Sequence, residues 1–184
     1  MWMANADGSD PRLLFTSERA MFALTWSPDG SKIAFIDDGL MVVEADGSHP
    51  RTLSRNFAVG YLFRPVWSPD SRTITFVAFD GPNPLIDKSL PAEDRDTDAF
   101  KGTSIHLVDV LTGAERPLIA GGTTGTIDPA WSPDGSQLVF ASTRSGTSEV
   151  WAVNADGTNL HQITTMGQLV RFPSWQRPQP PAKP

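Results

Sequence analysis

A pentapeptide that occurs three times constrains the fold of this chain more than any other feature. It reads WSPDG at 26–30, WSPDS at 67–71 and WSPDG again at 131–135. A fourth tryptophan, in RFPSWQRPQ, continues the series, and successive tryptophans stand 41, 64 and 44 positions apart. Periods of about 40 to 45 residues are typical of repeat proteins in which each unit is one small sheet. We therefore align the chain on Trp26, Trp67, Trp131 and Trp175.

Strand patterns surround each copy of the pentapeptide. A run that alternates polar and apolar residues follows it at 31–37, 71–79 and 136–143, and this period of two predicts a half-buried strand. A second element, an apolar run followed by a Gly-containing turn and another short run, predicts a β-hairpin. It occurs four times, at 1–15, 40–54, 104–119 and 149–164. Each repeat is therefore predicted to hold four antiparallel strands.

Four short antiparallel strands in a recurring unit are the signature of a β-propeller blade. We predict an all-β fold, a β-propeller fragment with three full four-stranded blades and a half-blade at each end. The predicted parts are a half-blade at 1–17, blades at about 20–55, 62–119 and 126–165, an insertion at 80–103, a final strand at 170–176 and a Pro-rich tail at 178–184.

The segment WSPDGSQLVFASTRSGTSEVWAVNADGTNLHQIT, at 131–164, resembles the WD40-like repeat of the TolB family. The pentapeptide that opens the blade and the NADG hairpin that closes it carry the resemblance together. The resemblance implies a non-catalytic propeller in the periplasm, or otherwise outside the cytoplasm, that works in envelope integrity. It also implies a protein or peptide partner at the mouth of the central channel. The chain lacks the N-terminal domain of TolB itself, so "TolB-like" is as far as the resemblance goes.

Both ends of the sequence look like partial blades. MWMANADG at the start matches VWAVNADG at 150–157, and the last tryptophan is followed by no further strand pattern. We expect the chain to be the C-terminal portion of a larger propeller whose remainder is missing from it. In the alternative, the two half-blades combine into a fourth blade, which would then lack its second strand.

Candidate binding residues follow from the predicted blade topology. The first strand of each blade lines the channel, and the residues three places before each tryptophan are Ala23, Arg64, Asp128 and Phe172. These residues differ between repeats, whereas scaffold positions should not. With two arginines of the irregular loops, they give our candidate channel-mouth contacts: Arg64, Asp128, Arg144 and Arg171. The alternative is that each is a solvated charge on the rim.

The pentapeptide itself is predicted to be structural. Proline fixes φ, aspartate bonds the backbone of its own turn, glycine takes the left-handed conformation, and tryptophan packs between blades. The residues given this role are Trp26, Asp29, Gly30, Trp67, Asp70, Trp131, Asp134, Gly135 and Trp175.

Several kinds of chemistry find no support in the sequence. The net charge of −6 argues against a nucleic-acid partner, and the absence of cysteine excludes thiolate chemistry. No apolar run is long enough for membrane insertion. Asp94, Asp96 and Asp98 resemble the start of a calcium loop, but Ala99 and Ile105 stand where Gly and Glu are needed. We therefore expect no metal, no cofactor and no catalytic residue.

Two alternatives to a binding scaffold stay open. The chain could be the propeller part of a prolyl-oligopeptidase-type peptidase, because such enzymes carry related repeats before a hydrolase domain. It could also be the propeller of a sensor or a transcriptional regulator. The sequence upstream of these repeats would discriminate among the three.

Overall fold

The computed structural model describes residues 1–56, 63–79 and 101–176, and their regular structure consists of β-strands. A hairpin is formed by β1 (Trp2–Met3) and β2 (Arg12–Leu13). Three four-stranded sheets follow in chain order. They consist of β3 (Phe22–Trp26), β4 (Lys32–Ile36), β5 (Leu40–Glu44) and β6 (Arg51–Ser54); of β7 (Val66–Trp67), β8 (Thr73–Phe79), β9 (Thr103–Asp109) and β10 (Glu115–Ile119); and of β11 (Thr126–Trp131), β12 (Gln137–Ser142), β13 (Glu149–Asn154) and β14 (His161–Gln162).

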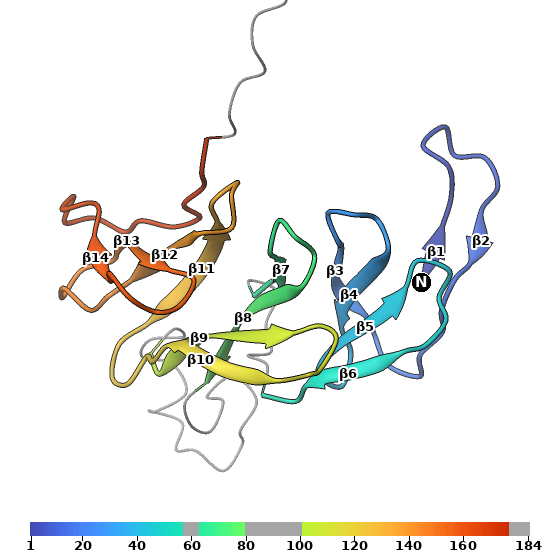
Figure 1. The fold of residues 1–184 in the computed structure, drawn as a ribbon, viewed down its shortest axis with the longest axis horizontal. Coiled ribbons are helices and arrows are strands. Elements are labelled where there is room, and N and C mark those ends of the chain that lie inside the picture. The colour runs from blue at the N-terminus through green and yellow to red at the C-terminus, as the bar shows by residue number, and fades with distance from the viewer. Residues whose placement is uncertain (57–62, 80–100, 177–184) are drawn as a thin grey trace, which may run out of the picture.

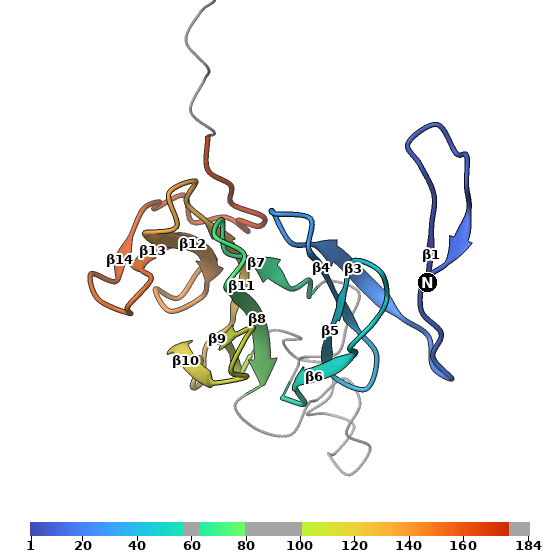
Figure 2. The same ribbon diagram turned by 45° about the vertical axis from the view of Figure 1, so that its right-hand side comes forward.

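Each four-stranded sheet is a meander in which neighbouring strands are consecutive and antiparallel. The predicted all-β class is confirmed. The sheets lie side by side in chain order, with hairpin β1–β2 at one end and the sheet of β11 to β14 at the other (Figures 1 and 2). The first strands β3, β7 and β11 are neighbours across the sheets, as expected of strands that face a common centre.

The apolar core consists of three clusters, each between consecutive sheets. The largest lies mainly between the first two four-stranded sheets, where it includes Phe63, Trp67 and Phe76, and it extends to Ile127 and Ala141 of the third. The second lies between the last two and contains Leu138 and Phe140. The third joins the N-terminal hairpin to the sheet of β3 to β6. Because each sheet buries apolar side chains against its neighbours, the sheets act as a rigid frame for the loops.

The N-terminal hairpin is attached by the residues that follow β2. Leu14 and Phe15 pack against the third cluster, and the Phe15 and Phe35 ring centroids are 5.5 Å apart. Figures 1 and 2 show the hairpin well away from the red C-terminal segment. The alternative in which the two half-blades combine into one blade is therefore not the arrangement found.

The predicted strand at 170–176 does not form. No described residue pairs with this segment in a β-ladder, and a strand exists only with a partner. The segment nevertheless lies beside β11: the Trp175 Nε1 donates a hydrogen bond of 3.1 Å to the Ala130 carbonyl. Trp67 makes the equivalent contact two repeats earlier: its Nε1 donates to the Thr25 carbonyl at 3.2 Å. In both cases the acceptor is the residue just before the tryptophan of the preceding repeat. The segment therefore occupies the place of a first strand without ladder bonds.

Membrane-spanning helices and metal clusters are two features that the sequence does not predict. None of the described residues forms a helix that could span a membrane. Nor do they contain a cluster of three or more metal-binding side chains. Asp94, Asp96 and Asp98 lie outside the described residues, as does most of the predicted insertion.

Candidate functional site

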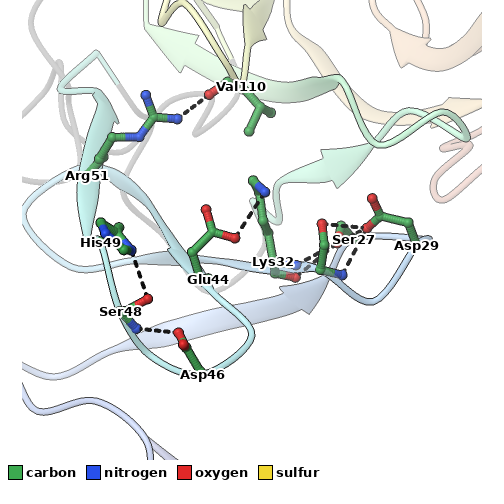
Figure 3. Close-up of polar contacts among 10 residues, drawn as sticks. Ser27, Asp29, Lys32, Glu44, Asp46, Ser48, His49, Arg51 and Val110 are labelled. Carbon is green, nitrogen blue, oxygen red and sulfur yellow. Dashed lines mark hydrogen bonds and ion pairs between the residues drawn. The ribbon is translucent and has the colours of Figure 1, made fainter.

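The WSPD turns are held by contacts within each turn. Ser27 Oγ donates to Asp29 Oδ1 at 2.6 Å (Figure 3). The backbone N–H of Ser31 donates to the same oxygen at 2.9 Å. The turns at 67–71 and 131–135 repeat the serine-to-aspartate bond at 2.6 Å. The hydrogen bond from the serine hydroxyl is the main cause that lowers the pKa of Asp29 and of Asp134 to about 2. Every carboxylate of the motif thus has partners in its own turn.

Trp26 differs from the other motif tryptophans. Its side chain is 47% exposed, whereas Trp67 is buried between sheets. The neighbour on the Trp26 side is the two-stranded hairpin, which supplies no inner strand to cover the indole. Packing between blades therefore describes Trp67 and Trp175, which both donate to a neighbouring sheet, but not Trp26 in this chain.

Two arginines link consecutive sheets on the side of the Asp-Gly turns. Figure 3 shows Arg51 of β6 reaching the carbonyl of Val110, in the turn after β9. Arg116 of β10 makes the equivalent contact one repeat later, with the Ala155 carbonyl at 2.7 Å. Sequence reasoning did not single out these residues, although the repeated arginine before a leucine at 51–53 and 116–118 was a signal that could have done so.

Three of the four positions that stand three places before a tryptophan share an unusual backbone conformation. Ala23, Asp128 and Phe172 have φ between 53° and 55°, in the left-handed region that residues other than glycine seldom adopt. The ladder shifts register at Ala23 and at Asp128, so both residues lie in β-bulges. Bulges bend a strand and re-aim side chains, and they are frequent next to functional sites. Arg64 is not among the residues with positive φ.

A cavity of about 420 Å³ lies where these positions meet. It is lined by Phe63, Arg64, Val66, Val77, Asp128, Pro129, Phe172 and Pro173. The cavity therefore brings together the residues that stand three places before the tryptophan in three successive repeats. They are Arg64 just before β7, Asp128 in β11 and Phe172 in the C-terminal segment. A volume of this size is within the range of small-ligand and side-chain pockets, about 300 to 1,000 Å³.

Asp128 and Arg171 form an ion pair at the edge of this cavity. Arg171 Nε donates to Asp128 Oδ2 at 2.5 Å, and Arg171 Nη2 donates to Oδ1 at 3.2 Å. The Phe172 N–H donates to the same carboxylate at 3.2 Å, and the Asp128 side chain is only 4% exposed. The guanidinium of Arg171 also lies over the Phe172 ring, 4.7 Å from its centroid. These contacts dock the C-terminal segment on β11.

Arg144 does not join the cavity. Its guanidinium lies over the rings of Phe140 and Trp151, at 5.4 and 5.2 Å, and its Nε donates to Ser142 Oγ at 3.1 Å. Burial lowers the pKa of Arg144. Arg64 and Asp128 line the cavity, and Arg171 pairs with Asp128. Arg144 is engaged within its own sheet, by residues of β11, β12 and β13.

Comparisons with known proteins agree with a β-propeller fold. Residues 37–178 match the family model described as the TolB beta propeller domain. The chain belongs to this family. Tol-Pal system protein TolB of Anaeromyxobacter dehalogenans is 28% identical over 195 residues, which cover 94% of this chain and 37% of that protein. This TolB-family chain spans less than half the length of the first curated relatives that it matches, 44% and 37%.

Solved structures show the same fold. TolB from Acinetobacter baumannii superposes with a TM-score of 0.64 at 18% identity, over 94% of this chain and 39% of that one. A prolyl endopeptidase, studied for inter-domain dynamics, superposes with a TM-score of 0.64 at 16% identity, over 90% of this chain and 26% of that one. Identities this low show a shared fold, and a fold does not fix a function.

A peptidase is among these neighbours, and one turn of this TolB-family chain holds the residue types of a serine-peptidase centre. Ser48 Oγ lies 2.8 Å from His49 Nδ1, and Figure 3 shows both side chains in the turn after β5. The nearby Asp46 accepts the Ser48 backbone N–H at 2.9 Å rather than a histidine N–H. A triad needs the acid to orient the histidine, so this is an Asp-Gly turn and not a catalytic site.

Glu149 is a buried acid that sequence reasoning missed. Its side chain is 1% exposed and accepts hydrogen bonds from Thr164 Oγ1 at 2.5 Å and from the Gly167 N–H at 2.7 Å. The Thr164 bond is the main cause that lowers the pKa of Glu149. The carboxylate thus holds the loop that leads to the C-terminal segment.

Proposed function

We propose that the chain forms part of a non-catalytic propeller that binds a protein or peptide segment at the mouth of its central channel. The observation that carries the proposal is the cavity lined by Arg64, Asp128 and Phe172. These residues differ in chemistry although they occupy equivalent positions in a regular frame. Rigid scaffolds that present variable residues at loop ends commonly bind ligands there.

The cellular location is part of the same proposal. We propose that the propeller works outside the cytoplasm, in the cell envelope, on the basis of its TolB relatives. The name of those relatives places them in the Tol-Pal system. The family match and the coverage of 94% of this chain support this assignment over that of a sensor or regulator.

A second candidate function has one observation in its favour. The superposition on a prolyl endopeptidase has the same TM-score as that on TolB, so the fold alone does not separate a scaffold from the propeller part of a peptidase. Hydrolysis of a proline-containing fluorogenic peptide by the complete product of the gene would favour this candidate. A complete product that binds a protein partner and leaves the peptide intact would favour the scaffold.

Site-directed photo-cross-linking tests the scaffold proposal. We would place p-benzoylphenylalanine at position 172, which is exposed at the cavity, and at position 111, which is exposed on a turn between β9 and β10. In cells of the source organism we expect a discrete cross-linked protein from position 172 and not from the control position.

Purified partner then provides the quantitative test. We expect the Phe172→Ser variant to bind the cross-linked protein about tenfold more weakly than the unchanged chain, because an aromatic contact surface is lost. A partner that binds both proteins equally, or that cross-links equally from positions 111 and 172, would contradict the proposal.

A further inference from the structure

The cavity at the channel mouth has apolar walls and very few polar groups. Phe63, Val66, Val77, Pro129, Phe172 and Pro173 supply the apolar surface, while Arg64 and Asp128 supply the charges. Pockets of this composition derive orientation and specificity from the few polar groups that they contain. The state of those two charges therefore decides what kind of group fits.

The charge of Asp128 is already neutralised. Its carboxylate accepts two hydrogen bonds from Arg171 and one from the Phe172 N–H. Arg64, in contrast, is exposed and has no hydrogen-bond or ion-pair partner among the described residues. The cavity therefore presents one unpaired guanidinium, although the chain as a whole carries a net charge of −6.

The repeat explains why Arg64 is left unpaired. Asp128 and Arg171 stand three and four places before successive tryptophans, and their side chains meet across the repeat boundary. The corresponding positions one boundary earlier hold Arg64 and Ile127. An isoleucine has no acceptor to offer a guanidinium. The boundary between the later two repeats therefore has an aspartate–arginine ion pair. The boundary before it has an arginine without a carboxylate partner at the corresponding position.

We propose that the cavity binds a carboxylate adjacent to an apolar side chain, supplied by a peptide segment of the partner. Arg64 pairs with the carboxylate through its planar fork of donors, and the apolar side chain packs against Phe172 and Pro173. This inference rests on the proposed function and names the chemistry of its ligand. The surrounding apolar surface and the negative net charge favour a single carboxylate over a polyanion.

Capped tetrapeptides with an N-terminal dye test the proposal by fluorescence anisotropy on the 184-residue chain. We expect Gly-Phe-Asp-Gly-amide to bind about tenfold more tightly than Gly-Phe-Asn-Gly-amide, because a charge-assisted hydrogen bond is lost. Gly-Ala-Asp-Gly-amide should also bind more weakly. A Gly-Phe peptide with a free carboxylate, compared with its amide, shows whether a chain terminus serves as well as an acidic side chain.

Protein variants assign the preference to Arg64. The Arg64→Gln variant should bind the Asp and Asn peptides equally, and Arg64→Lys should keep part of the preference. Arg12→Gln, which removes an exposed arginine of the distant hairpin, should behave like the unchanged chain. An Asp preference that survives in Arg64→Gln would overturn the inference.

Other outcomes separate this inference from the function on which it rests. If Asp and Asn peptides bind the unchanged chain equally, the carboxylate inference fails while peptide binding stands. If neither binds but the cross-linked partner does, the inference fails alone; if neither peptide nor partner binds, both fail. Competition by inorganic phosphate, at concentrations where acetate has no effect, would also overturn the carboxylate as the ligand.

Discussion

At the scale of single residues, the motif aspartates show how polar side chains stabilise a turn. Asp134 accepts hydrogen bonds from the Ser132 hydroxyl and from the backbone and hydroxyl of Ser136. All three hydrogen bonds are strongest when the carboxylate is ionised, so they favour its charged form. The pKa of Asp134 is accordingly lowered to about 2 from its ordinary value of 3.8.

This lowered pKa predicts a pH dependence of stability. On acidification the unfolded chain takes up its proton first, so the contribution of Asp134 is fully present above about pH 4 and lost as the pH falls toward 2. We expect Asp134→Asn to lower the urea midpoint at pH 7, and the difference from the unchanged chain to shrink between pH 4 and pH 2.

Asp10→Asn serves as the control for Asp134. Asp10 is also exposed in a turn, but the structure shows no hydrogen bond to its carboxylate among the described residues. Its variant should therefore keep the midpoint of the unchanged chain. An Asp134→Asn difference that stays constant from pH 7 to pH 2 would contradict the role given to the carboxylate.

Ser71 shows why one copy of the pentapeptide ends in serine. Its φ is 61°, which is unfavourable for a residue with a side chain, yet its hydroxyl accepts the Asp29 N–H of the neighbouring turn at 3.1 Å. We expect Ser71→Ala to lose the bond and keep the strain, at a cost of about 1 kcal/mol. Ser71→Gly loses the bond but relieves the strain, and should be close to neutral.

Urea denaturation of the three proteins measures this order. The variant with alanine should unfold at a lower urea concentration than the variant with glycine. If alanine leaves the midpoint unchanged, the contact between the two turns contributes nothing to stability.

At the scale of elements, the segment 170–176 is held by side chains rather than by a ladder. Trp175 donates to the Ala130 carbonyl, and Arg171 pairs with Asp128. We expect Arg171→Met to leave a buried carboxylate unpaired, a change that typically costs about 3 to 5 kcal/mol. Because the segment can detach by itself, the loss should appear as faster amide exchange at 170–176 rather than as a lower global melting temperature.

A second substitution and a control make this prediction specific. Asp128→Asn added to Arg171→Met removes the unpaired charge and should restore part of the protection. Arg19→Met breaks the exposed pair with Asp38 and should leave exchange at 170–176 unchanged. Equal exchange in the unchanged chain and in Arg171→Met would show that the ion pair does not hold the segment.

Comparison of sequence with structure also belongs to this scale. The period of two, the Asp-Gly turns and the repeated tryptophan predicted all-β sheets of four antiparallel strands, because these patterns are local. The partner of Asp128 could not be predicted in the same way, since it depends on a contact between repeats 43 residues apart. Glu149 was missed because a single acid at a strand start has no sequence signature of burial.

The predicted final strand failed for a related physical reason. The residues of 170–176 have the pattern of a first strand, and Trp175 makes the contact of one. Strand formation requires a second strand to pair with, and no described residue provides it. Sequence can indicate a position in a repeat, but only the arrangement in space decides whether a ladder forms.

At the scale of the whole molecule, both ends of the row of sheets expose apolar side chains. In and beside the N-terminal hairpin and β3, the exposed large apolar residues are Trp2, Leu13, Leu24 and Trp26. Around and after β14 they are Leu160, Ile163, Met166 and Leu169. In the middle, the sheets bury the equivalent surface against one another. Exposed apolar surface that gathers on one side of a protein marks places where other protein surfaces bind.

We therefore expect the 184-residue chain to self-associate as its concentration rises, which sedimentation velocity measures directly. Lysine in place of both Leu13 and Leu24 should shift the distribution toward monomer, because charges then stand on the apolar end surface. Leu111→Lys is the matched control: Leu111 is 83% exposed, but it lies alone on a turn. Monomer at every concentration, or an equal effect of Leu111→Lys, would show that the end surfaces do not drive association.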